Sequence, residues 1–354
     1  MLAVTLPTQG TTMTSIDPLH FFSRHPAEPI TEASITRLRR LPIPTPLVVR
    51  KLVELQGQAW LDGFQSVRYM HLGDTVVTHF SFWLVSFWAA VLDMRKDVCK
   101  PWISAREWTN ARIHKKWSPE LRELAGDTKA FLAALPWDNE PVRVMWRYLG
   151  PHMTMSSQQN DMLDNLSDHI AAQQHLAGIM CVKGLALTVK IMEAAATRDA
   201  GTYQTENSFR WIRELGDDIV QRKQKTLTQH HLGKDYPHWV SLVIDGEHEL
   251  IRYGDSFGGN IPPDVLEAYQ WWLSQHTESQ FSLQRLPIAI QEVNDTSSCG
   301  FLAHNSLEHF AFPESVPLLA TSEIQGARMK IFIRTGEQIL AQVCSNTNLF
   351  RSLP

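Results

Sequence analysis

The stretch HWVSLVIDGEHELIRYGDS, residues 238–256, decides how this chain folds. Two short runs rich in β-branched and aromatic residues, WVSLVI and ELIRYG, flank an Asp-Gly pair, which is a strong hairpin signal. A turn centred on Gly246 and Glu247 predicts that His238 and Asp255 lie opposite each other, with Cβ atoms roughly 4.5–5.5 Å apart. An aspartate that accepts from one imidazole nitrogen fixes the tautomer and leaves the other nitrogen free as a base.

The segments after the hairpin predict more of a small sheet. Residues 262–276, PPDVLEAYQWWLSQH, have helical spacing and a proline near the first turn. The run FSLQRLPIAI at 281–290 is typical of a strand, and MKIFI at 329–333 predicts a further strand. We therefore expect a small sheet in the C-terminal part of the chain.

The chain before the hairpin is predicted to be mainly helical. Residues 79–92 form an apolar run longer than a normal strand, so we expect a buried helix there. The segment 118–135 opens on a serine in the position of a helix N-cap. Residues 163–198 are rich in alanine and leucine with helical spacing, interrupted at Gly178 and Gly184. Helices here and a sheet later predict an α+β fold.

A cysteine stands at the predicted start of a helix in NDTSSCGFLAHNSLEHF, residues 294–310. With Ser297 or Ser298 as N-cap, Cys299 falls in the first turn, where the partial positive charge of the helix end favours the thiolate. A nearby imidazolium would favour it further. Each of these residues alone is more often structural, but the His–Asp pair and the capped Cys-Gly together indicate a nucleophile. The inner face of the helix is predicted to carry Ala303, Ser306, Leu307 and Phe310.

These residues resemble a known family, the SUMO-specific cysteine peptidases that process ubiquitin-like proteins. The resemblance lies in the His-Trp pair at 238–239, the Asp of YGDS, SCGFLA around Cys299 and, more weakly, AWLDGFQSV at 59–67. The chain order His, Asp, Cys is also that of the family. The resemblance implies a papain-like α+β fold with a small mixed sheet. It implies His238 as general base, Asp255 as its orienting partner and Cys299 as nucleophile. Trp239 and Trp60 would roof a narrow tunnel for a Gly-Gly tail.

Two positions depart from the family pattern. The family carries a glutamine six residues before the nucleophile that donates to the oxyanion, and here that position is Val293. Gln291 is the preferred replacement, and Asn294 is an alternative amide donor. The choice matters because losing one oxyanion donor typically lowers the rate by roughly 10²–10³-fold. In WLDG, Asp62 stands one place before the expected position.

The domain organisation follows from the extent of the resemblance. Residues 1–45, rich in Pro, Thr and Ser, are expected to form a loosely ordered arm. Residues 46–354 are expected to form one cysteine-protease-like domain with its catalytic core at about 236–312. The resemblance is absent at about 105–225, which is expected to be a large, mostly helical, lineage-specific insertion.

The resemblance implies a peptidase or isopeptidase that cleaves after the C-terminal Gly-Gly of a ubiquitin-like modifier, with SUMO favoured and no cofactor required. One alternative is acyl transfer to a protein lysine with the same triad order. That reaction would need a basic coenzyme A pocket, for which RKQK at 222–225 is the sole candidate. A second alternative is a domain that binds a ubiquitin-like tail without cleaving it.

Composition excludes several other classes. A net charge of −4 leaves no electrostatic footprint for nucleic acid. The four scattered cysteines contain no CxxC pair, which argues against a zinc site and a disulfide framework. Paired histidines have no third ligand at a suitable spacing, so no metal is assigned.

No signal peptide is recognised and the apolar run at 79–92 is too short to span a bilayer. We therefore expect a nuclear or cytoplasmic location and no membrane partner.

Overall fold

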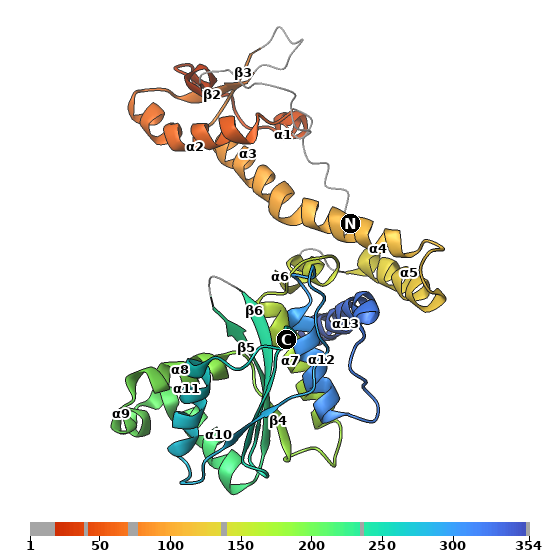
Figure 1. Ribbon diagram of the computed structural model, residues 1–354. Helices are drawn as coiled ribbons and strands as arrows, with labels where there is room; N and C mark the ends of the chain where they lie inside the picture. The colour runs from red at the N-terminus through yellow and green to blue at the C-terminus, as the bar shows by residue number, and fades with distance from the viewer. Residues whose placement is uncertain (1–17, 39–41, 70–76, 136–139, 234–236, 352–354) are drawn as a thin grey trace. The chain divides into compact units, whose positions relative to one another are not determined.

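The computed structural model describes residues 18–38, 42–69, 77–135, 140–233 and 237–351. The chain forms two compact units, Met1–Ser104 and Ala105–Pro354, shown in Figure 1. This division differs from the expected single domain over 46–354. The expected N-terminal arm also differs, because several residues between 18 and 45 are buried in the core of the N-terminal unit.

The N-terminal unit packs helices against a small antiparallel sheet in the order β1-β2-β3. Phe21, Phe22 and Ile43 from the expected arm lie in its core beside Leu52 of α2 and Trp88 of α3. The arm prediction for residues 1–17 lies outside the described residues. The elements are η1 (Pro18–Phe21), β1 (Phe22–Ser23), α1 (Glu32–Leu38), α2 (Pro46–Leu61), β2 (Ser66–Tyr69), β3 (Thr78–Phe80), α3 (Trp83–Met94), the π-helical turn η2 (Arg95–Cys99) and the start of α4 (Lys100–Arg112).

The C-terminal unit contains a five-stranded mixed sheet between layers of helices. Its elements are α5 (Pro119–Ala134), α6 (Glu140–Arg143), η3 (Met145–Tyr148), α7 (Ser156–Ala171), β4 (Met180–Val182), α8 (Ala186–Thr197), α9 (Ala200–Thr205), η4 (Asn207–Phe209), α10 (Arg210–Gln221), β5 (Lys225–Leu232), β6 (His238–Asp245), β7 (Leu250–Gly254), α11 (Pro263–Ser274), β8 (Ser282–Arg285), α12 (Cys299–Ala311), η5 (Thr321–Glu323) and α13 (Ile324–Arg351). The α+β class and the small mixed sheet are confirmed.

The sheet has the order β4-β5-β6-β7-β8, with the outer pairs parallel and the inner pairs antiparallel. The predicted hairpin is present as β6 and β7, but its predicted register is wrong. Asp245 is opposite Leu250, and Ser241 is opposite Gly254. The connection is longer than the assumed two-residue turn, and Glu249 in it adopts a positive φ of 55°. Pairing therefore starts two residues later on β7 than was predicted.

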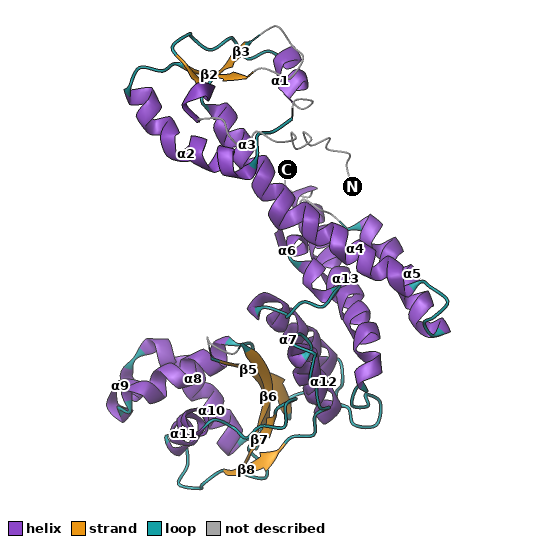
Figure 2. Cartoon of the chain, turned by 45° about the horizontal axis from the view of Figure 1, so that its top comes forward, coloured by secondary structure: helices purple, strands orange, loops and turns teal. Residues whose placement is uncertain are grey.

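Helices cover both faces of this sheet (Figure 2). On one face, α8, α10 and α11 pack on Val240, Leu242 and Ile244 of β6. On the other face, α7 and α12 pack on Trp239 and Val243. All residues of β6 are buried, as expected for a central strand covered on both sides. This double coverage explains why its sequence is nearly continuously apolar.

The stretch expected as an insertion, 105–225, takes part in this architecture. It supplies β4 and begins β5, which pair with each other in parallel, and β5 pairs with β6. Its helices α7, α8 and α10 contribute to the apolar cores on both faces. The sheet that carries the hairpin is therefore completed by residues from this stretch.

Most of the predicted helices and strands are confirmed, with two differences. Ser118 caps α5 by accepting from the Leu121 amide at 3.2 Å, and α11 and α12 form where predicted. The helical run predicted over 163–198 instead contains β4, and the strand predicted at 329–333 is part of α13. Met329 and Phe332 of that run are both buried, which is helical rather than alternating spacing.

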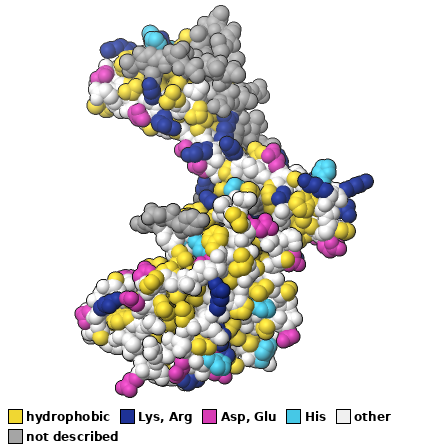
Figure 3. All heavy atoms as spheres, in the orientation of Figure 1, with side chains coloured by type: hydrophobic (Ala, Val, Ile, Leu, Met, Phe, Trp, Pro, Cys, Tyr) yellow, Lys and Arg dark blue, Asp and Glu magenta, His cyan; other side chains and the backbone are white. Residues whose placement is uncertain are grey.

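No helix among the described residues is long and apolar enough to cross a membrane. On the face of the C-terminal unit shown in Figure 3, acidic and basic side chains are scattered among apolar and uncharged atoms. Among the cysteines whose side chains are described, Cys99, Cys181 and Cys299 are free thiols.

Candidate active site

The structure brings His238 and Asp255 together at the end of the hairpin. The imidazole Nε2 donates to Asp255 Oδ1 at 2.7 Å, and both side chains are buried. The other ring nitrogen, Nδ1, is buried and has no well-aligned hydrogen-bond partner among the described residues. A histidine held in this way keeps one nitrogen available for proton transfer.

A tight turn after β7 fixes the Asp255 carboxylate. The backbone N–H of Phe257 donates to Asp255 Oδ1 at 2.8 Å, and that of Gly258, at a φ of +74°, donates to the Asp255 carbonyl at 2.9 Å. Gly259 lies against the carboxylate, because a Cβ there would be 2.6 Å from Asp255 Oδ2. The phenyl ring of Phe257 stacks on the His238 imidazole, with ring centroids 4.4 Å apart and an interplanar angle of 20°. Residues 256–260, SFGGN, therefore shape the turn beside His238.

Cys299 is the first residue of α12, as predicted, and it is 1% exposed. Ser298 holds the N-cap position, one of the two predicted for it, but it does so in a helical conformation and its side chain caps no amide. Asp295 stabilises the turn that precedes the helix, because its Oδ1 accepts from the amides of Ser297 at 2.9 Å and Ser298 at 3.1 Å. The Asp-Thr-Ser-Ser sequence is typical of such an Asp-centred turn, and this signal could have identified the turn before the helix.

The charge balance of the site keeps His238 protonated. Burial would lower the pKa of the imidazole. The hydrogen bond to Asp255 and the nearby Cys299 thiol outweigh burial and raise the pKa of His238 to about 9. The pKa of Asp255 is lowered in spite of its burial, because His238 and the Phe257 amide stabilise the carboxylate. An imidazolium beside a sulfur at a helix N-terminus is the environment that activates a cysteine nucleophile.

The structure places Gln291 in the loop before the cysteine helix, where it is 5% exposed. Its Oε1 accepts from Ser256 Oγ at 3.0 Å, and its Nε2 donates to the Asp295 carbonyl. One amide hydrogen is thus used within the loop and one remains. Asn294 and Val293 are exposed.

The two tryptophans lie in different surroundings. Trp239 is 2% exposed, and its indole N–H donates to the Thr154 carbonyl at 3.0 Å. Its ring packs against His231, with centroids 4.6 Å apart. Trp60 belongs to the N-terminal unit, near the end of α2, and is 67% exposed. Their predicted role as the roof of a tunnel stays a prediction.

Sequence reasoning missed two residues that hold the cysteine helix. Thr154 and Gln159, from the stretch expected as an insertion, lie against Gly300, and any Cβ at that glycine would overlap both side chains. Gln159 donates to Thr154 Oγ1, and Gln229 of β5 donates to the Gly300 carbonyl at 3.3 Å. Gly300 is therefore required by close packing directly after Cys299. No local sequence signal points to these contacts, because the residues are far apart in the chain.

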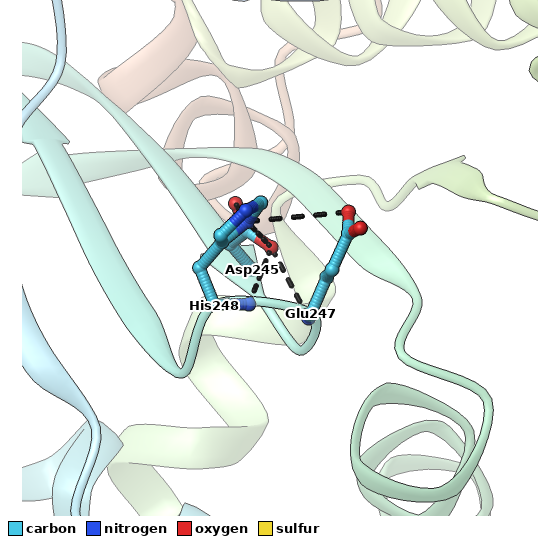
Figure 4. Close-up of side chains that lie close together, drawn as sticks. All are labelled: Asp245, Glu247 and His248. Atoms are coloured by element: carbon cyan, nitrogen blue, oxygen red, sulfur yellow. Dashed lines mark hydrogen bonds and ion pairs between the residues drawn. The ribbon is translucent and has the colours of Figure 1, made fainter.

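One cluster with possible metal ligands lies at the turn between β6 and β7, as Figure 4 shows for Asp245, Glu247 and His248. The Asp245 carboxylate already pairs with Arg252 at 3.1 Å and accepts from the backbone amides of Glu247 and His248. These contacts hold the turn, and we assign the cluster a structural role.

No family model matches the sequence, and no curated protein matches it. Among solved structures, the chain is similar to the SUMO protease Ulp1 with its catalytic cysteine oxidised to a sulfonic acid, at 16% identity and a TM-score of 0.45, over 62% of this chain and 96% of that chain. It is similar to the catalytic domain of a Chaetomium thermophilum Ulp1-like SUMO protease, at 14% identity and a TM-score of 0.45, over 60% and 87% of the two chains. It is also similar to the Xanthomonas campestris effector XopD bound to ubiquitin, at 14% identity and a TM-score of 0.33, over 51% and 91%. At these identities the likeness is one of fold, and the function proposed below rests on the geometry of the site.

Proposed function

We propose that the C-terminal unit is a cysteine peptidase that cleaves after the C-terminal Gly-Gly of a ubiquitin-like modifier, with SUMO as the proposed modifier. The observation that carries this proposal is the position of His238, which donates to Asp255 through Nε2 and lies beside the Cys299 thiol. In this proposal His238 is the base, Asp255 the orienting carboxylate and Cys299 the nucleophile. This is the arrangement needed for acyl transfer through a thioester.

The proposed reaction begins with attack of the Cys299 thiolate on the carbonyl carbon of the last glycine of the modifier. The resulting tetrahedral intermediate collapses as the C–N bond breaks, and His238 transfers its proton to the departing amine. Water, deprotonated by the now neutral imidazole, then attacks the thioester and releases the modifier with a free carboxylate. Asp255 holds the ring and stabilises the imidazolium in both steps. No cofactor takes part in this scheme.

The oxyanion of the tetrahedral intermediate needs hydrogen-bond donors. We propose that backbone N–H groups at the start of α12 and the remaining amide hydrogen of Gln291 supply them. The first N–H groups of a helix have no partner within the helix and carry a partial positive charge. The contacts of Gln291 to Ser256 and Asp295 fix its amide group, and a fixed donor stabilises a developing charge better than a mobile one.

Recognition of the modifier is proposed to depend on flat aromatic walls that admit glycine and exclude side chains. Trp239 is the proposed wall in the C-terminal unit, and the role of Trp60, which belongs to the N-terminal unit, stays a prediction from the sequence. We also propose a nuclear or cytoplasmic location for the protein. The partners are then a ubiquitin-like modifier and its conjugates.

The proposal is tested by incubating the full chain with ubiquitin-like modifiers that carry a C-terminal thiol-reactive group. Cys299→Ala is the nucleophile variant, and Cys181→Ala is a matched control because Cys181 is also a free thiol of the C-terminal unit. The expected result is a covalent adduct with SUMO in the wild type and in Cys181→Ala, and none in Cys299→Ala. Absence of an adduct with every modifier, while small thiol reagents label Cys299, would overturn the proposed tail recognition.

A further inference from the structure

A partly exposed aromatic side chain lies over the buried histidine of the site. Phe257, in the turn after β7, is 44% exposed, whereas His238 is 4% and Asp255 is 9% exposed. The phenyl ring is stacked on the imidazole, with ring centroids 4.4 Å apart and an interplanar angle of 20°. A single exposed phenylalanine needs no explanation by itself. This one has a specific neighbour, because its ring covers one face of the imidazole.

The backbone of the same residue contacts the other member of the pair. The Phe257 N–H donates to Asp255 Oδ1 at 2.8 Å, and this is the oxygen that accepts from His238 Nε2 at 2.7 Å. The next residue, Gly258, closes the turn by donating from its N–H to the Asp255 carbonyl at 2.9 Å. The turn that places the carboxylate therefore also places the phenyl ring.

A second loop holds this turn. The backbone N–H of Gln291 donates to the Ser256 carbonyl at 2.8 Å, and Ser256 Oγ donates to Gln291 Oε1 at 3.0 Å. Arg285, at the end of β8, donates to the Gly258 carbonyl at 2.6 Å. Ser256 and Gln291 are both buried. The residues on either side of Phe257 are thus fixed by hydrogen bonds, which is what a residue that orients another side chain requires.

The imidazole needs such a contact because one hydrogen bond fixes a point and not a plane. The bond between His238 Nε2 and Asp255 leaves the ring able to turn about the line of that bond, and the last torsion of a histidine side chain has broad energy minima. Nδ1 is buried and has no well-aligned hydrogen-bond partner within the described part of the chain. The direction in which Nδ1 points, and hence its reach for proton transfer, therefore depends on the plane of the ring.

We propose that Phe257 is a positioning residue for His238, whose flat ring fixes the plane of the imidazole and keeps water away from its hydrogen bond to Asp255. The importance of this role for catalysis rests on the proposed role of His238 as base. The shape of the side chain at position 257 should matter more than its apolar character, because a stacked ring restricts the imidazole plane and an aliphatic side chain does not.

The test follows the Nε2 proton of His238 in the full chain carrying isotope-labelled histidine. An imidazole proton donated to a carboxylate gives a downfield proton resonance in water, and absence of the resonance in His238→Gln assigns it. Phe257→Leu keeps an apolar side chain and loses the flat ring, whereas Phe257→Tyr keeps the ring. Trp211→Leu is the matched control, because Trp211 of α10 is also a partly exposed aromatic residue, at 36%. Circular dichroism establishes that each variant is folded.

The expected result is a slowly exchanging resonance in the wild type, Phe257→Tyr and Trp211→Leu, and its loss through exchange with water in Phe257→Leu. In cleavage of a SUMO fusion, Phe257→Leu should lower kcat by up to roughly 10²-fold with KM little changed, since misplacing a catalytic group has this effect. Phe257→Tyr should restore most of that loss.

Three outcomes would overturn the inference. They are a wild-type chain without the resonance, unchanged exchange in folded Phe257→Leu, and equal loss of the resonance in Phe257→Tyr. Faster exchange in Phe257→Leu alone, in a protein that forms no modifier adduct, would uphold the positioning of His238 by Phe257 while the proposed peptidase function failed.

Discussion

His238 Nε2 and Asp255 Oδ1 are 2.7 Å apart, although the strand register does not make these residues partners. Extending the register of β6 and β7 outward from Ser241 and Gly254 places Phe257 opposite His238, and the two rings are indeed stacked. Asp255 reaches the histidine diagonally from the first position after β7. The turn that follows β7, rather than the hydrogen bonds between β6 and β7, therefore brings Asp255 to His238.

The first prediction concerns the carboxylate. Asp255→Asn should lower kcat by roughly 10²–10⁴-fold, because an amide neither fixes the required tautomer nor stabilises the imidazolium. The pKa of His238 should fall, since the hydrogen bond to Asp255 is a main cause of its raised value of about 9. The alkaline limb of a kcat–pH profile should therefore move to lower pH. A profile that is lower in rate but unshifted would contradict this account.

The second prediction concerns Gly259. A methyl group at this position would lie 2.6 Å from Asp255 Oδ2 and displace the carboxylate. Gly259→Ala should therefore lower kcat by on the order of 10- to 100-fold with little change in Tm, because a small misplacement of a catalytic group is enough for such a loss. Gly126→Ala serves as control, because a Cβ there meets no atom within 4 Å. Equal activities in the two variants would show that the carboxylate tolerates the methyl group.

The third prediction concerns the packing directly after Cys299. In Gly300→Ala the new methyl group overlaps Gln159 and Thr154, which should lower the free energy of unfolding by about 1–3 kcal/mol and reduce activity. Gly326→Ala in α13 is the matched control, because its nearest contact is an ordinary 3.7 Å to Leu121 Cδ1. That control should be neutral or stabilise by up to about 1 kcal/mol. Chemical denaturation of both variants checks the difference.

The fourth prediction concerns pH and stability. Folding raises the pKa of His238 from 6.5 to about 9, so the folded protein keeps a proton that the unfolded chain releases in this window. The contribution of His238 to stability is therefore fully present below pH 6.5 and is lost as the pH rises through about 9. His238→Gln should destabilise the protein more below pH 6.5 than above pH 9. Thermal unfolding at both pH values measures this, and a pH-independent difference would refute it.

The fifth prediction separates the amide donors. Gln291→Ala should lower kcat by roughly 10²–10³-fold if it removes the oxyanion donor, while Asn294→Ala should have no effect because Asn294 is exposed. Ser256→Ala removes the 3.0 Å hydrogen bond to Gln291 Oε1 without removing the amide hydrogens. It should reduce stability and leave most of the activity. Similar kcat losses in Gln291→Ala and Ser256→Ala would indicate that Gln291 acts only by holding the loop.

The amino-acid sequence was sufficient to predict the elements whose signals are local. The hairpin of β6 and β7, the helix that begins at Cys299 and the serine cap of α5 all depend on neighbouring residues and short periodic patterns. The nearness of His238 to Asp255 was also predicted, although from an incorrect turn length. The connection has four residues instead of two, which shifts Asp255 by two positions relative to His238. A shift of two residues keeps a side chain on the same face of a strand, so Asp255 still reaches His238 diagonally.

The contacts that complete the site arise from segments far apart in the chain. Thr154 and Gln159 pack on Gly300, and Arg328 donates to Ser297, across separations that no local pattern encodes. The same reason explains why local patterns do not reveal that the stretch 105–225, expected to be an insertion, contributes strands and helices to the sheet and its cores. Local propensity determines which elements form, whereas burial of their apolar faces determines which distant side chains surround the cysteine.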